Sequence, residues 1–364
     1  MKGSKATLDR CALATVAAAY RLEGPTDEWL GRLLEAARPA LDRGKGVLGW
    51  TFRLGAAGRH GITSSIVDRG PVDPDLKAHW VASELEPSAS LGEGPKRRAE
   101  LLERVVALAI ARGDPRALES AAAAGERALG LTREELAPTY FGDLASWGIA
   151  DVVGAKMLDP TRRGVILSSP SGRFEDLTSA DERRWSLVMT HVVAGLRLRR
   201  RLDGTVGGDG EAILDPSGRV LHAEGPARDR RAVLRAAARR IDRARSRRGV
   251  SEAEATLLAW KGLVSGRWTL VDRFERDGRR YLVARPNAPD VPRPRGLSPR
   301  ERQIAAYAAM GHSNKRIAYA LGLAPSTVSS HLRKAMARLG ATDRAQLAAL
   351  FVGLQPPSSS SGST

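Results

Sequence analysis

The sequence predicts an α+β N-terminal region, in which helices pack on antiparallel sheets, joined to a small all-α domain at the C-terminus. Three observations lead to this prediction. Short paired runs of β-branched and aromatic residues alternate with helical patterns up to about residue 285. A proline-rich segment at residues 286–296 interrupts both patterns, because proline fixes φ and lacks a backbone donor. Residues 297–352 then show only helical patterns.

The first predicted unit covers residues 1–203. It opens with helices, because Leu30, Leu33 and Leu34 recur at helical spacing. Its strands are bounded by Gly and Asp, and a long helix near its end has Thr178 or Ser179 at the N-cap. The predicted strands are residues 46–54, 60–68, 147–159 and 162–170, and the predicted later helices are 96–114 and 178–202.

A second α+β unit is predicted over residues 211–285. Residues 211–225 read as two short strands across a turn, and residues 266–286 read as a hairpin with its turn at Asp277 and Gly278. In element order, residues 1–203 resemble a GAF sensory domain and residues 211–285 a PAS sensory domain. Residues 353–364, rich in Ser, Pro and Gly, are predicted to be a disordered tail.

The composition of the chain limits the classes of protein to which it can belong. The net charge of +17 favours a polyanionic partner such as nucleic acid. One cysteine, Cys11, excludes an intramolecular disulfide and fits the cytoplasm. No run approaches the roughly 18 to 20 apolar residues of a membrane span, so no membrane partner is predicted. No nucleotide-binding, metalloprotease or hydrolase motif is present and the histidines do not cluster, so we predict no catalytic residue, metal site or cofactor.

Four helices can be delimited between residues 297 and 352. Ser298 and Glu301 form a predicted capping box with Pro299 at the first helical position. The second helix is predicted to start after Ser313, and the third after Ser326. Glycines end the first three helices, at positions 311, 322 and 340. Two short helices joined by a tight turn are typical of a helix-turn-helix.

The third of these helices has two distinct faces. On a helical wheel its apolar residues form one stripe: Val328, Leu332, Ala335, Met336 and Leu339. The opposite arc is polar and holds Ser326, Ser329, Ser330, Arg333, Lys334 and Ala337. We predict that the first face packs inward and that the second is offered to a DNA groove.

The motifs "LSPRE", "SNK", "STV" and "RLG" make residues 297–350 resemble a LuxR-type, or GerE-like, DNA-binding domain. The resemblance implies that the third helix enters the major groove and that homodimers bind paired half-sites of double-stranded DNA. It also implies base-facing positions at Ser329, Ser330 and Arg333, and backbone contacts from Lys315 and Thr327.

Two departures from the family pattern redistribute these roles. Ser329 stands where many members have Lys, which removes a charged contact, and Arg316 stands where Glu commonly follows Lys. Arg333 is therefore the main predicted base reader, because arginine binds guanine bidentately. Lys315, Arg316 and Lys334 are predicted to contact phosphate, which adds salt dependence without sequence information.

The sequence thus predicts a cytoplasmic transcription regulator whose residues 1–285 receive a small-molecule or protein input. RNA polymerase is a further candidate partner, and the basic run 227–249 reads as a solvated helix face, with contact to DNA or polymerase as the alternative. Aromatic residues such as Trp50 and Trp80 fit either a core or a ligand pocket. Two other classes stay open: a sigma-like or polymerase-associated factor, and an enzyme with an appended DNA-binding domain.

Overall fold

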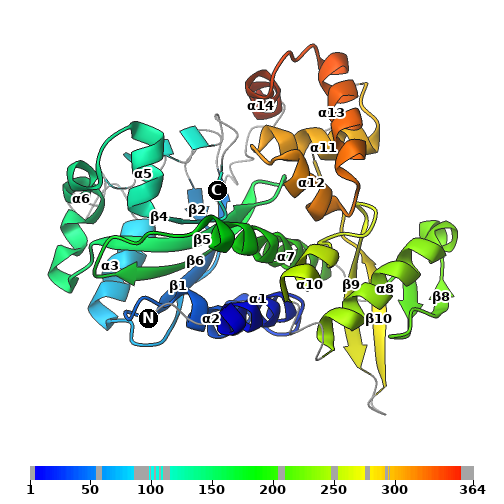
Figure 1. Cartoon of the computed structure of the whole chain (residues 1–364), viewed down its shortest axis with the longest axis horizontal. Coiled ribbons are helices and arrows are strands. Elements are labelled where there is room, and N and C mark those ends of the chain that lie inside the picture. The colour runs from blue at the N-terminus through cyan, green and yellow to red at the C-terminus, as the bar shows by residue number, and fades with distance from the viewer. Residues whose placement is uncertain are drawn as a thin grey trace, which may run out of the picture.

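A computed structural model gives the fold of the protein (Figure 1). It describes residues 5–54, 60–85, 98, 100, 101, 104, 105, 108, 109, 115–203, 210–246, 253–274, 279–291, 294 and 296–353. Most of the helix predicted over residues 96–114, the turn predicted at Asp277 and Gly278, and almost all of the predicted tail lie outside these residues.

The N-terminal unit is built on one antiparallel sheet with the order β2-β1-β6-β5-β4, and β3 also pairs with β1. Its strands are β1 (Val47–Leu54), β2 (His60–Ile62), β3 (Val67–Arg69), β4 (Leu118–Ser120), β5 (Asp151–Leu158) and β6 (Arg163–Ser171). The strand pair predicted around residues 159–164 is confirmed as β5 and β6. The single strand predicted over residues 60–68 is wrong, because two short strands there pair with different parts of β1.

Helices cover both faces of this sheet (Figure 1). They are α1 (Lys5–Ala19), α2 (Thr26–Leu41), α3 (Pro74–Leu85), α5 (Ala121–Leu129), α6 (Arg133–Phe141) and α7 (Ser179–Asp203). Alternate side chains of β5 point to opposite faces of the sheet. Val153 and Ala155 belong to a core shared with α1, α2 and α7. Val152 packs against a second core, which includes α3, α5 and α6. Thr178 caps α7 as predicted, since its hydroxyl accepts from the Asp181 backbone.

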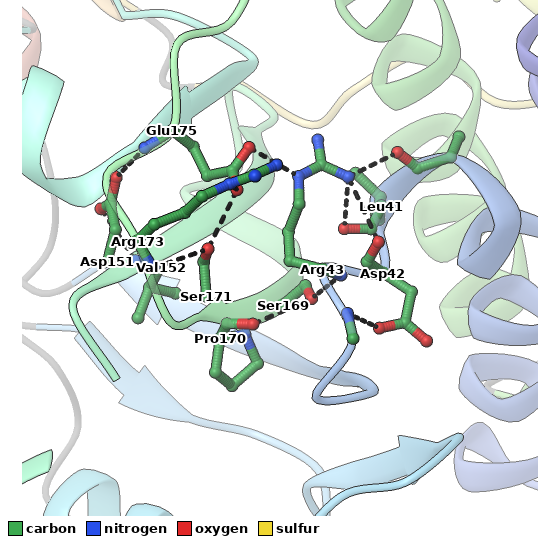
Figure 2. Close-up of polar contacts among 12 residues, drawn as sticks. Leu41, Asp42, Arg43, Asp151, Val152, Ser169, Pro170, Ser171, Arg173 and Glu175 are labelled. Carbon is green, nitrogen blue, oxygen red and sulfur yellow. Dashed lines mark hydrogen bonds and ion pairs between the residues drawn. The ribbon is translucent and has the colours of Figure 1, made fainter. Parts of the chain in front are cut away.

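A buried polar cluster ties the end of α2 to the end of β6 (Figure 2). Arg43 Nε donates to Glu175 at 3.1 Å, and the hydroxyl of Ser171 donates to the other carboxylate oxygen at 3.0 Å. Burial would raise the pKa of Glu175, but hydrogen bonds from Ser171 and Arg173 and the charge of Arg43 outweigh it and lower that pKa. Burial raises the pKa of Asp151, which accepts from the Glu175 backbone at 3.0 Å.

The second unit is a four-stranded antiparallel sheet with the order β8-β7-β10-β9. Its elements are β7 (Ala212–Leu214), β8 (Val220–Ala223), α8 (Arg231–Arg245), α10 (Ala253–Ala259), β9 (Trp268–Phe274) and β10 (Arg280–Pro286). The sheet packs on α8 through Leu234 and Ile241. The opposite face of α8 carries exposed Arg231, Arg235 and Arg239, one turn apart, as expected of an amphipathic surface helix.

The C-terminal domain has its own hydrophobic core, formed by α11 (Pro299–Ala309), α12 (Asn314–Leu321), α13 (Pro325–Leu339) and α14 (Arg344–Gly353). The start of the proline-rich linker is anchored rather than free, because Asn287 is fully buried. Its side-chain amide donates to Ala194 O at 2.8 Å, and its backbone oxygen accepts from Arg197 at 2.9 Å. The α+β and all-α classes predicted for the two parts are confirmed.

Candidate DNA-binding surface

The first helix of the C-terminal domain begins as its sequence predicts. The hydroxyl of Ser298 accepts from the Glu301 backbone at 3.3 Å, and the Glu301 carboxylate accepts from the Ser298 backbone at 2.9 Å. This capping box satisfies two backbone donors at the start of α11. Arg338 of α13 also forms an ion pair with Glu301, so the cap links the two helices.

A tight turn joins α12 to α13. Ser313 caps α12 by accepting from the Arg316 backbone, and Gly322 ends it with a φ of 63°. A side chain at Gly322 would be strained by this φ and would meet the carbonyl oxygen of Leu263 at 2.1 Å. Both ends of α12 are therefore fixed, one by a capping side chain and the other by a close approach to the second unit.

The prediction that Ser326 caps α13 is wrong. The helix begins at Pro325, and Ala324 occupies the N-cap position without a side-chain hydrogen bond. Proline suits the first helical position because its φ is already helical and the missing N–H would have no partner there. Ser326 consequently lies in the first turn with an exposed side chain.

The two faces of α13 divide as predicted. Val328, Leu332 and Ala335 are buried in the core of the domain, and Met336 and Leu339 pack against it. The polar arc faces outward, with Ser326, Ser330, Arg333, Lys334 and Ala337 exposed. Figure 1 shows α13 on the outer side of the domain, away from the first sheet. This arrangement leaves a continuous polar helix surface free to enter a groove.

The predicted base-reading residues differ in their surroundings. Within the described parts of the chain, Arg333 and Ser330 have no hydrogen-bond or ionic partner, so both can reach a ligand outside the protein. Ser329 is half-buried and occupied: its hydroxyl accepts from the Asn314 amide and donates to Pro325 O, both at 3.0 Å. Its side chain therefore links α12 to α13.

The predicted phosphate-contacting residues also differ in their exposure and in their partners. Lys315 and Lys334 are exposed and Thr327 is half-exposed; Lys315 and Thr327 lie in the first turns of α12 and α13, and Lys334 lies further along α13. Arg316 instead points into the N-terminal unit. Its guanidinium donates to Pro115 O at 2.7 Å and to the hydroxyl of Ser186 at 2.9 Å, and it pairs with the Glu182 carboxylate at 3.2 Å.

Some basic residues of this domain form hydrogen bonds within the domain or to the second unit, which the sequence did not indicate. Arg344 of α14 donates to His312 O and to the Asn314 side chain, both at 2.6 Å. Burial lowers the pKa of Arg344. Arg300 donates to Ser265 O and to the Gln303 side chain, which in turn donates to Gly266 O at 2.7 Å. These arginines position the domain and are less available to DNA than their charge suggests.

A buried aromatic cluster joins α12 to the rest of the chain. The Tyr319 hydroxyl donates to Leu257 O at 2.7 Å and lies 2.8 Å from His191 Nε2, and His191 Nδ1 lies 2.7 Å from the Tyr20 hydroxyl. Because Tyr319 donates to a carbonyl, its oxygen accepts from Nε2–H, and Nδ1 accepts from Tyr20. Burial lowers the pKa of His191 to about 3, so the imidazole is neutral.

A second polar contact lies beside this cluster. Arg197 of α7 is buried, pairs with Asp159 at 3.0 Å and also hydrogen-bonds Tyr307 of α11. The C-terminal domain is thus docked on the N-terminal unit and on the second unit through α11 and α12, whereas α13 faces outward. We call this set of contacts the docked interface; its polar members are Arg316, Tyr319, Tyr307, Arg300 and Gln303.

The short helix, the turn and the outward polar helix together define a helix-turn-helix DNA-binding domain. Residues 295–351 match the family model described as "Bacterial regulatory proteins, luxR family". This part of the chain is therefore a LuxR-type domain, and its partner is DNA.

No curated protein matches the chain. A solved structure described as "SdiA in complex with octanoyl-rac-glycerol" is 11% identical with a TM-score of 0.32, over 97% of both chains. A crystal structure of Escherichia coli SdiA is 13% identical with a TM-score of 0.28, over 92% of this chain and 94% of that one. Within the described residues, no helix is long and apolar enough to cross a membrane.

Proposed function

We propose that the chain is a transcription regulator in which residues 1–285 control how tightly the LuxR-type domain binds DNA. The observation that carries this proposal is the position of Arg316. Its guanidinium is held by Glu182, Ser186 and Pro115, although it lies in the first turn of α12, where it could meet phosphate. Docking and phosphate contact compete for the same side chain.

The roles within the DNA-binding surface follow from exposure. Arg333 and Ser330 read base edges, and Ser329 orients α13 while its hydroxyl stays within reach of the groove. Lys315, Lys334 and Thr327 contact the backbone and set the register. Arg316 adds a phosphate contact when the domain leaves the docked interface. A single short recognition helix covers few base pairs, so the chain acts as a homodimer on paired half-sites. Because its partner is DNA, we expect it to act in the cytoplasm.

The proposal is tested by releasing Arg316 in the full-length protein. Glu182→Ala removes the carboxylate from the pair, and DNA binding is measured over a salt series. We expect tighter binding than in the wild type, because Arg316 no longer has to leave a carboxylate before it contacts phosphate, and an unchanged salt slope, because the complex neutralises the same number of phosphates. Glu134→Ala, at an exposed carboxylate on α6, controls for the change in net charge. Equal DNA affinities for Glu182→Ala and Glu134→Ala would contradict the proposal.

A further inference from the structure

A cavity of about 180 Å³ lies between the first sheet and the LuxR-type domain. Trp50 of β1, Trp80 of α3, Gly154 of β5 and Ser168 of β6 line it from the N-terminal unit. His312 and Arg316 line it from the C-terminal domain. The cavity is therefore complete only while the domain is docked.

Several buried polar atoms around the cavity have no partner in the described parts of the chain. They are Trp50 Nε1, Trp80 Nε1, Ser168 Oγ and His312 Nδ1. Buried polar groups of folded proteins are almost always hydrogen-bonded, so four orphaned atoms on one cavity indicate a missing polar partner. Each lies on a residue that lines the cavity, and they come from both sides of the docked interface.

The chemistry of these atoms defines what the partner must offer. The two indole N–H groups can only donate, and the serine hydroxyl can donate or accept. His312 hydrogen-bonds the Leu158 backbone, which leaves its Nδ1 as an acceptor in the neutral ring. Burial lowers the pKa of His312 to about 3, so the ring stays neutral. A ligand must therefore combine a hydrogen-bond acceptor with a donor.

Charge and size restrict the ligand further. Three of the four charged residues that line the cavity are in ion pairs, Glu119 with Lys156 at 2.9 Å and Arg316 with Glu182 at 3.2 Å, which favours a neutral ligand; the fourth is Arg116. The volume slightly exceeds the roughly 150 Å³ of an apolar cavity that holds benzene. It is well below the roughly 300 to 1,000 Å³ of sites for drug-sized molecules. One substituted ring fits this space.

We propose that the cavity binds a neutral molecule the size of one substituted ring, bearing a carbonyl acceptor and an N–H or O–H donor. Because the ligand touches both domains, its binding favours the docked arrangement and weakens binding to DNA. The effect on DNA rests on the proposed function; the existence of the site does not.

Gly154 provides a way to close the cavity. It lies in β5 on the cavity side, and a Cβ built there meets nothing within 4 Å. Gly154→Val places two methyl groups into this space, and a β-branched residue suits a strand. Gly61 of β2 also has open space at its Cβ but does not line the cavity, so Gly61→Val is the matched control.

The test uses benzamide, toluene and benzoate as probes on the full-length protein, with calorimetry to measure binding without DNA. We expect benzamide to bind one to one, and toluene and benzoate at least tenfold more weakly. Gly154→Val should lose benzamide binding at least tenfold, and Gly61→Val should keep it. Trp80→Phe retains an aromatic ring without the donor, so it should bind benzamide several-fold more weakly.

No benzamide binding up to its solubility limit, or equal binding by wild type and Gly154→Val with a native-like melting curve, would overturn the ligand site. The effect on DNA is then measured with saturating benzamide. We expect lower DNA affinity in wild type and Gly61→Val, and no change in Gly154→Val. Binding of benzamide without any change in DNA affinity would overturn the coupling alone. The Glu182→Ala experiment needs no ligand, so its failure is separate from a failure of the cavity.

Discussion

The two helices of the helix-turn-helix have opposite surroundings. The polar face of α13 is exposed, and its Arg333 has no partner in the described parts of the chain. Two polar residues of α12 are engaged instead, with Arg316 bound to the N-terminal unit and Tyr319 buried in the aromatic cluster. The helix proposed to read DNA bases is thus exposed, whereas Arg316 of the helix proposed to contact the DNA backbone is bound to the N-terminal unit.

The largest expected effect concerns the exposed helix. Arg333→Ala should weaken binding to a specific site by about 1 to 3 kcal/mol, because it removes the bidentate contact to guanine. Binding to unrelated DNA should change little. Competition between specific and random duplexes measures the difference, with exposed Arg235 of α8 replaced by Ala as the control. If the variant keeps full sequence preference, Arg333 is not the base reader.

The next effect concerns the docked helix. Tyr319→Phe removes a hydroxyl that donates to Leu257 O and accepts from His191 Nε2. His191 Nε2 keeps its contact with Trp260 O at 3.1 Å, but the buried Leu257 carbonyl loses the hydroxyl donor. Leaving buried polar groups unpaired costs about 1 to 3 kcal/mol, so the docked interface should open more often. Amide hydrogen exchange around residues 256–264 should become faster. Unchanged exchange there would mean that the cluster does not hold the domain.

Acid should weaken the docked interface through His191. Its pKa is lowered to about 3 when docked, so an opened form, in which His191 returns towards its ordinary 6.5, binds the proton more tightly. The docked form is therefore fully stabilised above pH 6.5. As the pH falls from 6.5 towards 3, the equilibrium constant for docking decreases by at most about tenfold per pH unit. Tyr20, Tyr319, Trp260 and Lys261 face this ring.

The role of His191 is measured by amide hydrogen exchange at the docked interface, or by protease sensitivity, between pH 7 and 5. His191→Gln should flatten the pH dependence, and His222→Gln, at an exposed histidine of β8, should not. A pH dependence that persists in His191→Gln would assign the titration to another group, such as His312.

The smallest effect is expected at Ser329. Ser329→Ala removes the hydroxyl that links Asn314 to Pro325 O, a contact at the half-exposed edge of α13. A hydrogen bond of this kind contributes about 0.5 to 1.5 kcal/mol to stability. The melting temperature should fall by a few degrees, with DNA affinity lowered less than by Arg333→Ala. Loss of specificity equal to that of Arg333→Ala would make Ser329 a direct base reader.

The contrast between α13 and α12 also marks what the sequence could predict. Local signals were sufficient for the caps at Ser298 and Ser313, for the glycine at 322 and for the apolar stripe of α13, because each depends on residues a few positions apart. The strand pair of β5 and β6 was predictable for the same reason. Short strands such as β2, β3 and β4 contain too few residues to show a clear alternation of apolar and polar side chains, so the sequence does not delimit them.

The docked interface was not predictable. Arg316, Glu182 and Pro115 are far apart in the sequence, and nothing local distinguishes Arg316 from Lys315, which is exposed. Only the fold brings the three together. The start of α13 was missed because a serine after a proline resembles a cap, whereas the fixed φ of Pro325 already starts the helix. The cavity is equally non-local, since its lining comes from two domains.

We propose that the LuxR-type domain leaves the docked interface when it binds DNA. Spin labels at exposed Arg183 of α7 and exposed Ala345 of α14, in a Cys11→Ala background, report the distance between the domains by electron–electron double resonance. We expect one narrow distance distribution without DNA and a second, longer distance with saturating DNA. A single, unchanged distribution in the presence of DNA would contradict it.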